Sequence, residues 1–315
     1  MRPLSYDAAM FRPMVLVAAG MSAMSLGLAP QTPPSDATAA LLATVRQALG
    51  GEAALTDVKS FDVKGTLTRT SGSGTRDEAI EFAADLPYRF VQVTESTSDL
   101  GPLGTARHRR REGFAYDRPI AESVDDSPVP PPTVAAKAPT TPQEIADRDA
   151  RQLISARRAF SVFVLPLFAQ SPASCPMTFA AGGHVVGPSG PADIIDATGP
   201  DGFVHHLFVD ATTHLIVGIA WMAKPVLSMT VASSAAMTSR GLATAGAPLV
   251  LPAHPTANLP DVQWQLTIGD YRSANGLHWP HRLTTTFGGR KWEDVKLGAY
   301  RINGKVDESM FRIEK

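Results

Sequence analysis

The chain has 315 residues, 44% of them hydrophobic, and a formal net charge of −1 at pH 7. The hydrophobic fraction is ordinary for a globular core, and the near-zero charge gives no sign of a nucleic acid or other polyanion as partner. The 25 glycines and 26 prolines indicate many turns and long loops.

Residues 1–29 predict an export signal. Two arginines precede an uncharged apolar run over residues 14–29 that ends in small residues, and prolines follow it. The run is shorter than the roughly 18 residues that a membrane-spanning helix needs. We therefore expect cleavage near Ala29, a flexible N-terminus over 30–35 and a periplasmic or secreted product with no stable membrane insertion. Translation from Met10 would shorten the signal and leave this prediction unchanged.

The first part of the mature chain predicts one helix and then a series of strands. Ser35 and Asp36 can cap a helix over 37–49. From Phe61 onward, apolar and polar residues alternate with a period of two, which is typical of strands with one buried face. Short strands of this kind at regular spacing indicate an open antiparallel sheet or half-barrel. We expect them at 61–68, 80–84, 88–93, 105–111 and 113–116.

Two segments predict long loop insertions. Residues 119–142 contain seven prolines and few large apolar side chains, which favours a solvated insertion or a flap over the sheet. Residues 233–260 are rich in Ala, Ser, Thr and Pro. Because the strands before and after each loop share the same one-sided pattern, we predict a single domain over 36–315.

A second helix is predicted after the first insertion. Thr141 and Glu144 fit a capping box, with a proline at the first helical position. The helix ends in the apolar run 159–168, which is too short to span a bilayer and must be buried in the core or line a cavity. Further strands are expected at 193–198, 203–209, 215–222, 270–272, 276–282 and 295–297.

The sequence gives little support for catalysis or metal binding. Its one cysteine, Cys175, excludes an internal disulfide. Successive strand residues face opposite sides of a sheet, so His205 and His206 are not expected to bind one ion. His278 and His281 are three residues apart in a strand, which also places them on opposite faces. No nucleophile elbow or glycine-rich phosphate loop occurs. We predict no cofactor, no metal and no catalytic residue, with an enzyme of dispersed site as a minor alternative.

One stretch of the chain concentrates positive charge. Arg107, Arg109 and Arg111 would share one face of a strand. Such a stripe can contact an anionic head group or an acidic partner, or it can protect an exposed sheet edge. The sequence leaves both interpretations open.

The order of motifs resembles that of LolA-like and LolB-like outer-membrane lipoprotein carrier and sorting proteins. The similarity includes the strand–turn–strand phrase at 208–216, the Gly-x-x-x-Pro strand at 276–283, and the closing residues Asn303, Asp307 and Phe311. The resemblance implies a mainly β, α+β fold: an incomplete antiparallel β-barrel covered by a few helices, with a hydrophobic cavity between them. It also implies an acyl-gating arginine, for which the candidates by strand position are Arg69, Arg89 and Arg109.

The apolar helix end is the segment best suited to cover the apolar face of the sheet. The expected function is non-catalytic binding of an acyl chain, lipid or lipidated protein in the cell envelope. The alternative is an envelope sensor or interaction module that contacts another envelope protein. Four tryptophans, at positions 221, 264, 279 and 292, could form a cavity floor or pack on helices. The predicted cavity residues are Phe61, Val63, Leu67, Phe82, Phe90, Phe160, Phe163, Val164, Leu167, Phe168 and Trp221.

Overall fold

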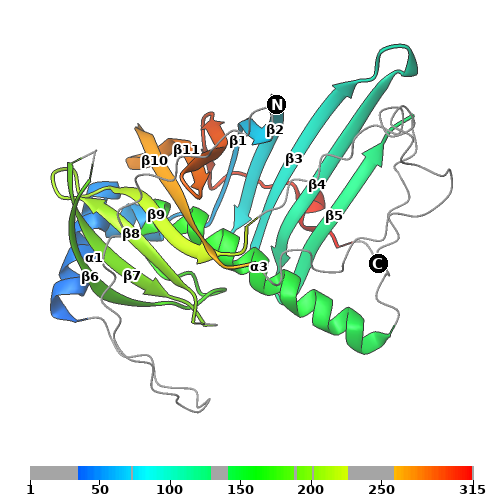
Figure 1. The fold of residues 1–315 in the computed structure, drawn as a ribbon. Coiled ribbons are helices and arrows are strands. Elements are labelled where there is room, and N and C mark those ends of the chain that lie inside the picture. Colours follow the sequence, from blue (N-terminus) through cyan, green and yellow to red (C-terminus); the bar gives the residue numbers. More distant parts are fainter. Residues whose placement is uncertain are drawn as a thin grey trace, which may run out of the picture. The chain divides into compact units, whose positions relative to one another are not determined.

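The computed structural model of the protein describes residues 35–71, 74–128, 141–187, 190–200, 202–225 and 259–313. These residues form one antiparallel sheet of 13 strands and three α-helices (Figure 1). The strands are β1 (Ser60–Ser71), β2 (Gly74–Asp85), β3 (Arg89–Asp99), β4 (Thr105–Ala115), β5 (Arg118–Asp126), β6 (Thr178–Gly187), β7 (Gly190–Thr198), β8 (Val204–Asp210), β9 (Ile216–Ala223), β10 (Val262–Ala274), β11 (Leu277–Phe287), β12 (Arg290–Leu297) and β13 (Arg301–Ile302).

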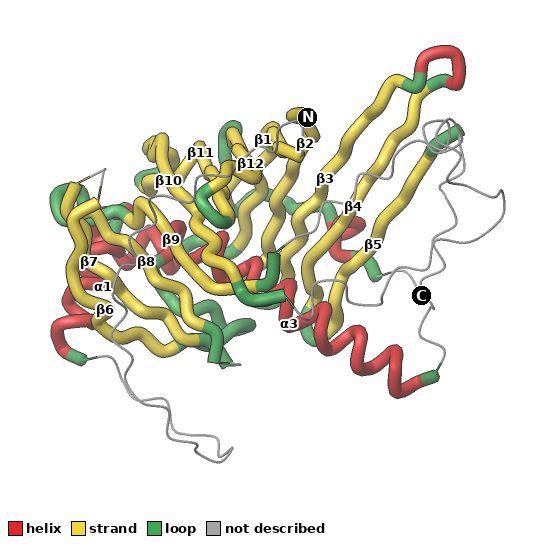
Figure 2. Tube along the Cα trace, viewed as in Figure 1, coloured by secondary structure: helices red, strands yellow, loops and turns green. Residues whose placement is uncertain are grey.

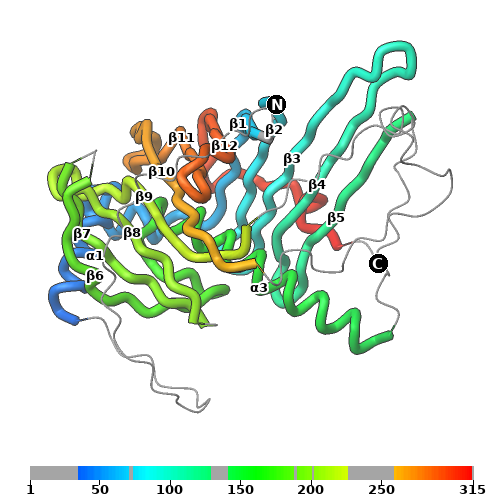
Figure 3. The backbone as a smooth tube through the Cα atoms, in the orientation of Figure 1, coloured from blue at the N-terminus to red at the C-terminus, as the bar shows by residue number. Residues whose placement is uncertain are grey.

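The strand order shows that the sheet is open. It runs β5-β4-β3-β2-β1-β12-β11-β10-β9-β8-β7-β6, with β13 paired to β1. The two halves join where β1 lies beside β12, so that Leu67 pairs with Val295 from the other end of the chain (Figure 3). The end strands β5 and β6 do not pair with each other. The predicted fold, an incomplete antiparallel barrel with helices, is confirmed (Figure 2).

The helices begin where the capping residues predicted. Helix α1 (Asp36–Leu49) is capped by Ser35, whose side chain accepts a hydrogen bond from the Thr38 amide. A short helix, α2 (Glu52–Thr56), follows. Helix α3 (Pro142–Phe168) starts with the complete capping box of Thr141 and Glu144. Two 3-10 turns, η1 (Gly101–Leu103) and η2 (Glu308–Phe311), complete the described helical structure.

Two predictions for the first half were wrong. The strands expected at 105–111 and 113–116 are the single strand β4, because Gly113 is not a break. A Cβ atom at Gly113 would lie 2.0 Å from the Phe90 carbonyl oxygen, so glycine here allows β3 to approach closely. The loop expected over 119–142 does not begin at residue 119, because residues 118–126 form β5, and residues 129–140 of that segment lie outside the described residues. This is an end strand of the sheet, where a proline such as Pro119 is tolerated.

The second half contains two strands that the sequence did not predict, β6 and the two-residue β13. Strand β6 lacks a clean period-two pattern because Gly182 and Gly183 interrupt it, and its pairing register with β7 shifts at this point. The other strands lie at or around the predicted positions. The predicted signal over 1–29 and nearly all of the predicted loop at 233–260 lie outside the described residues.

The two faces of the sheet are covered differently. We call the face on which α3 lies the helix face and the opposite one the outer face. The main hydrophobic core is on the helix face and includes Phe61, Phe82 and Phe90 from the strands. A smaller apolar cluster on the outer face packs Val91 and Val93 against the C-terminal residues Met310 and Phe311.

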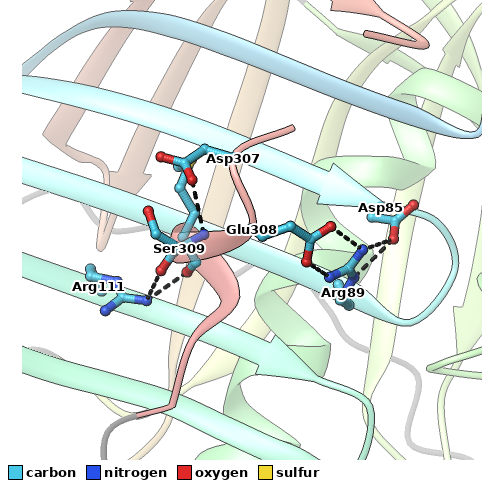
Figure 4. Close-up of polar contacts among 7 residues, drawn as sticks. Asp85, Arg89, Arg111, Asp307, Glu308 and Ser309 are labelled. Carbon is cyan, nitrogen blue, oxygen red and sulfur yellow. Dashed lines mark hydrogen bonds and ion pairs between the residues drawn. The ribbon is translucent and has the colours of Figure 1, made fainter. Parts of the chain in front are cut away.

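Arg111 fixes the C-terminal segment on the outer face (Figure 4). Its Nη2 donates hydrogen bonds to the carbonyl oxygens of Ser309 (3.2 Å), Met310 (2.7 Å) and Arg312 (2.9 Å). Its Nη1 lies 2.5 Å from a carboxylate oxygen of Glu122. Figure 4 also shows a second attachment nearby, in which the Arg89 guanidinium contacts Glu308 and Asp85.

We expect Arg111→Met to lower the free energy of unfolding by about 2–4 kcal/mol, because three carbonyl groups and a carboxylate lose a charged donor. The matched control is Arg109→Met in the same strand. Arg109 forms an exposed ion pair with Glu95 at 2.9 Å, and its removal should cost less than about 1 kcal/mol. Urea denaturation measures both effects. Equal stabilities for the two variants would contradict the role given to Arg111.

Candidate ligand-binding cavity

The apolar end of α3 packs on the helix face through aromatic rings. The Phe163 ring stacks on that of Phe82, with centroids 4.2 Å apart and an interplanar angle of 18°. Phe160 lies 4.9 Å from Phe90 and 5.3 Å from Phe114. The contact between this helix end and the apolar strand face, predicted from the sequence, is therefore present.

Beside this contact the helix and the sheet border an open-sided space of about 490 Å³, which we call the helix-face cavity. Its volume falls within the roughly 300–1,000 Å³ that is usual for ligand sites. The lining residues come from β2 and β3, from α3, and from the segment that precedes β8 together with β8 to β12. The lining includes Ile80, Phe82, Phe90, Ala159, Val162, Phe163, Phe203, His205, Trp221, Trp264, Leu266, Leu283, Trp292 and Val295.

Tryptophans dominate the wall on the side of β9 and β10. Trp221 of β9 and Trp264 of β10 are directly paired residues of neighbouring strands. Their rings stack with centroids 6.3 Å apart and an interplanar angle of 11°. Trp292 also lines the cavity. Trp279 does not; it is 1% exposed and packs in the core against Phe168 and Tyr300. Flat aromatic walls of this kind suit an apolar ligand.

One histidine lies in this apolar wall. His205 is 3% exposed and packs against the rings of Phe203 (4.8 Å) and Trp221 (6.0 Å). Its Nε2 lies 3.1 Å from the Ser161 hydroxyl of α3. Burial lowers the pKa of His205 to about 4, and the positive charge of Arg158 contributes in the same direction. The imidazole is therefore neutral at pH 7.

A charged cluster adjoins the cavity at Glu293, which is one of its lining residues. Arg69 lies 3.0 Å from Glu293 and 3.6 Å from the buried carboxylate of Glu78. Burial raises the pKa of Glu293, and the nearby guanidinium opposes that shift. Of the three arginines proposed for a gating position, Arg69 is thus the one whose side chain meets the cavity wall. Arg89 instead contacts Glu308 of the C-terminal segment, and Arg109 contacts Glu95.

The structure distributes the predicted cavity residues over three environments. Phe82, Phe90, Phe163 and Trp221 line the helix-face cavity. Phe160, Val164 and Phe168 line a smaller space of about 310 Å³ beside α2. The others, Phe61, Val63, Leu67 and Leu167, lie in closely packed core and are at most 2% exposed.

Sequence reasoning missed several lining residues. Trp264 and Trp292 could have been found, because the sequence places both in strands and tryptophans there can form a cavity floor. His205 also carried one, because it shares its strand face with the buried residues Leu207 and Val209. No local pattern pointed to Phe203.

The positive stripe on β4 lies on the outer face, away from the helix-face cavity. Arg109 and Arg111 line an outer-face depression of about 430 Å³ together with residues of the C-terminal segment. Protection of a sheet edge is not its role, because β4 is paired on both sides, with β3 and β5, and is not an edge strand. The neighbouring strand β5 occupies residues 118–126, where the sequence predicted a loop. Arg107 occupies the same strand and is exposed.

The contact between Ser161 and His205 does not have the geometry of a nucleophile and its base. The Ser161 side chain is fully buried, and its hydroxyl donates to the Arg158 carbonyl at 2.7 Å. His206, on the other face of β8, contacts Asp196 at 2.7 Å. Within the described ranges, no three His, Cys, Asp or Glu side chains gather as metal ligands would. Nor does any described helix have the length and hydrophobicity to cross a membrane.

Comparison with solved structures finds proteins that match most of this chain at low sequence identity. A LolA superfamily protein from Nitrosomonas europaea is 6% identical, with 88% of this chain and 98% of that one covered, at a TM-score of 0.43. A lipoprotein-sorting protein domain from Vibrio parahaemolyticus is 8% identical, with 86% and 94% covered, at 0.42. A DUF1329 family protein from Desulfovibrio piger is also 8% identical, with 89% and 98% covered, at 0.42.

Models of known protein families give no match to the chain, and curated protein sequences give none either. The argument for function therefore starts from the cavity and its lining residues.

Proposed function

We propose that this protein is a non-catalytic binder or carrier of an apolar ligand in the cell envelope. The ligand would be an acyl chain, a lipid or the lipid part of a lipidated protein. The observation that carries the proposal is the helix-face cavity of about 490 Å³, whose walls are mainly aromatic and aliphatic. The export signal predicted over residues 1–29 supports the location.

Binding of an apolar probe provides the test. Wild-type protein should bind N-phenylnaphthylamine with an increase in fluorescence, and Ala159→Phe should weaken binding about tenfold by filling the cavity. Ala159 lines the cavity and is exposed, so the larger side chain should not disturb the core. The matched control is Ala150→Phe, on an exposed part of α3 away from the cavity, which should bind as wild type does. Probe binding that is absent, or equal in all three proteins, would contradict the proposal.

A second candidate function is protein interaction at the sheet's end. Strand β5 is unpaired on one side among the described strands, and its Val124 is 58% exposed. Tyr88 and Tyr116 form an exposed stacked pair with centroids 6.2 Å apart. Native mass spectrometry of protein purified from its own envelope separates the candidates. Co-purified lipid supports the carrier, whereas a stoichiometric protein partner without lipid supports the interaction module.

A further inference from the structure

In the wall of the helix-face cavity, Nδ1 of His205 and Nε1 of Trp264 have no hydrogen-bond partner among the described residues. The two residues are 3% and 7% exposed, and both line the cavity. Buried polar atoms in folded proteins are nearly always paired, so an unpaired acceptor or donor beside a cavity is evidence of what the cavity binds.

The hydrogen bonds around His205 identify which nitrogen carries its proton. The Ser161 hydroxyl donates its one hydrogen to the Arg158 carbonyl at 2.7 Å. It must therefore accept a hydrogen bond from the His205 Nε2–H, 3.1 Å away. A neutral imidazole has a single N–H, so Nδ1 presents only a lone pair. The low pKa of His205, about 4, keeps the ring in this neutral form at pH 7. A ligand group that meets Nδ1 must be a donor.

Trp264 imposes the opposite requirement. An indole Nε1–H can only donate, so its partner must be an acceptor. Trp264 and His205 lie on β10 and β8, on either side of Trp221 in β9. Two strand spacings separate them, which is roughly 10 Å. A ligand can satisfy both with polar atoms at two points along its length.

We propose that the helix-face cavity selects an uncharged lipid bearing a hydroxyl or amide N–H, which donates to His205 Nδ1 while a ligand oxygen accepts from Trp264 Nε1. This inference rests on the proposed function and specifies the ligand class. A fatty carboxylate fits less well, because it has no proton to donate at pH 7. The Arg158 guanidinium also lines the cavity and lies over the Phe203 ring at 4.6 Å, so a carboxylate would be drawn there and would leave His205 Nδ1 without a donor.

A matched set of twelve-carbon ligands tests the selection. Dodecanol and dodecyl methyl ether both offer an oxygen acceptor, but only the alcohol donates. In displacement of N-phenylnaphthylamine at pH 7, dodecanol should bind about tenfold more tightly than the ether, and more tightly than laurate. Equal binding of alcohol and ether, or tighter binding of laurate, would overturn the inference. Failure of the wild-type protein to bind the probe at all would instead overturn the proposed function.

Variants assign the selection to His205. His205→Phe should abolish the preference for alcohol over ether. His206→Phe, on the outer face of the same strand, should retain it. Trp264→Phe should leave the preference for alcohol over ether in place, because the single oxygen of either ligand cannot reach Trp264 Nε1 and His205 Nδ1, roughly 10 Å apart, at the same time. A preference that persists in His205→Phe would overturn the assignment, and the wild-type comparison decides the question if that variant does not fold.

Discussion

The wild-type protein is expected to lose about 3 kcal/mol of its free energy of unfolding through His205 as the pH falls from 6.5 to about 4. A variant without this histidine should not show that loss. In the unfolded chain the imidazole takes up a proton near its ordinary pKa of 6.5, whereas in the folded protein burial lowers that pKa to about 4. The unfolded state therefore binds more protons across this interval. The contribution to stability is fully present above pH 6.5 and is lost as the pH falls toward 4.

Urea denaturation at a series of pH values measures this loss for wild type and for His205→Phe. The variant should show a shallower fall in stability, because phenylalanine does not titrate. The matched control is His206→Gln, since His206 is partly exposed on the outer face and contacts Asp196. It should keep the wild-type steepness between pH 6.5 and 4. Identical pH profiles for wild type and His205→Phe would show that the ring is accessible to protons in the folded protein.

Local patterns were sufficient to predict the fold class and most elements. The Thr141 and Glu144 capping box placed the start of α3 correctly, because capping depends on residues that are neighbours in the chain. Alternation of apolar and polar residues predicted strands such as β1 and β8 for a similar reason. Strand β6 was missed because its glycines interrupt the alternation of apolar and polar residues. It forms nevertheless, because it pairs with β7 through a shift in register at the glycines. Strand β5 was missed, because proline content suggested a loop, although an end strand tolerates proline.

The cavity was less predictable, because it depends on contacts between distant segments. Phe61 and Phe82 have the same pattern in sequence, yet only Phe82 lines the cavity. Phe61 is instead surrounded by Phe163, Phe168 and Trp279, with ring centroids 6.0–6.3 Å away. No periodicity distinguishes a strand residue that meets another side chain from one that faces empty space. The distinction appears only when β1, β11 and α3 are placed together.

Phe163→Asp is expected to unfold the protein or to lower its free energy of unfolding by about 4 kcal/mol or more. The Phe163 side chain is 7% exposed and stacks on Phe82, with Phe61 and Phe90 each at 6.0 Å. An aspartate here would place a charge among aromatic rings. Because the residue also lines the cavity, the change removes part of the binding surface as well. Urea denaturation and the near-ultraviolet circular dichroism of the aromatic rings measure the loss.

Two further variants separate folding from binding at this position. Ala150→Asp introduces the same charge at an exposed residue of α3 away from the cavity, and should change stability by no more than about 0.5 kcal/mol. Phe163→Leu should cost only about 1–2 kcal/mol, since a large apolar side chain remains in the core. That variant should stay folded and bind N-phenylnaphthylamine with altered affinity, because the cavity wall has changed shape. If Phe163→Asp stays folded and binds the probe as wild type does, Phe163 lies neither in the core nor in the cavity wall.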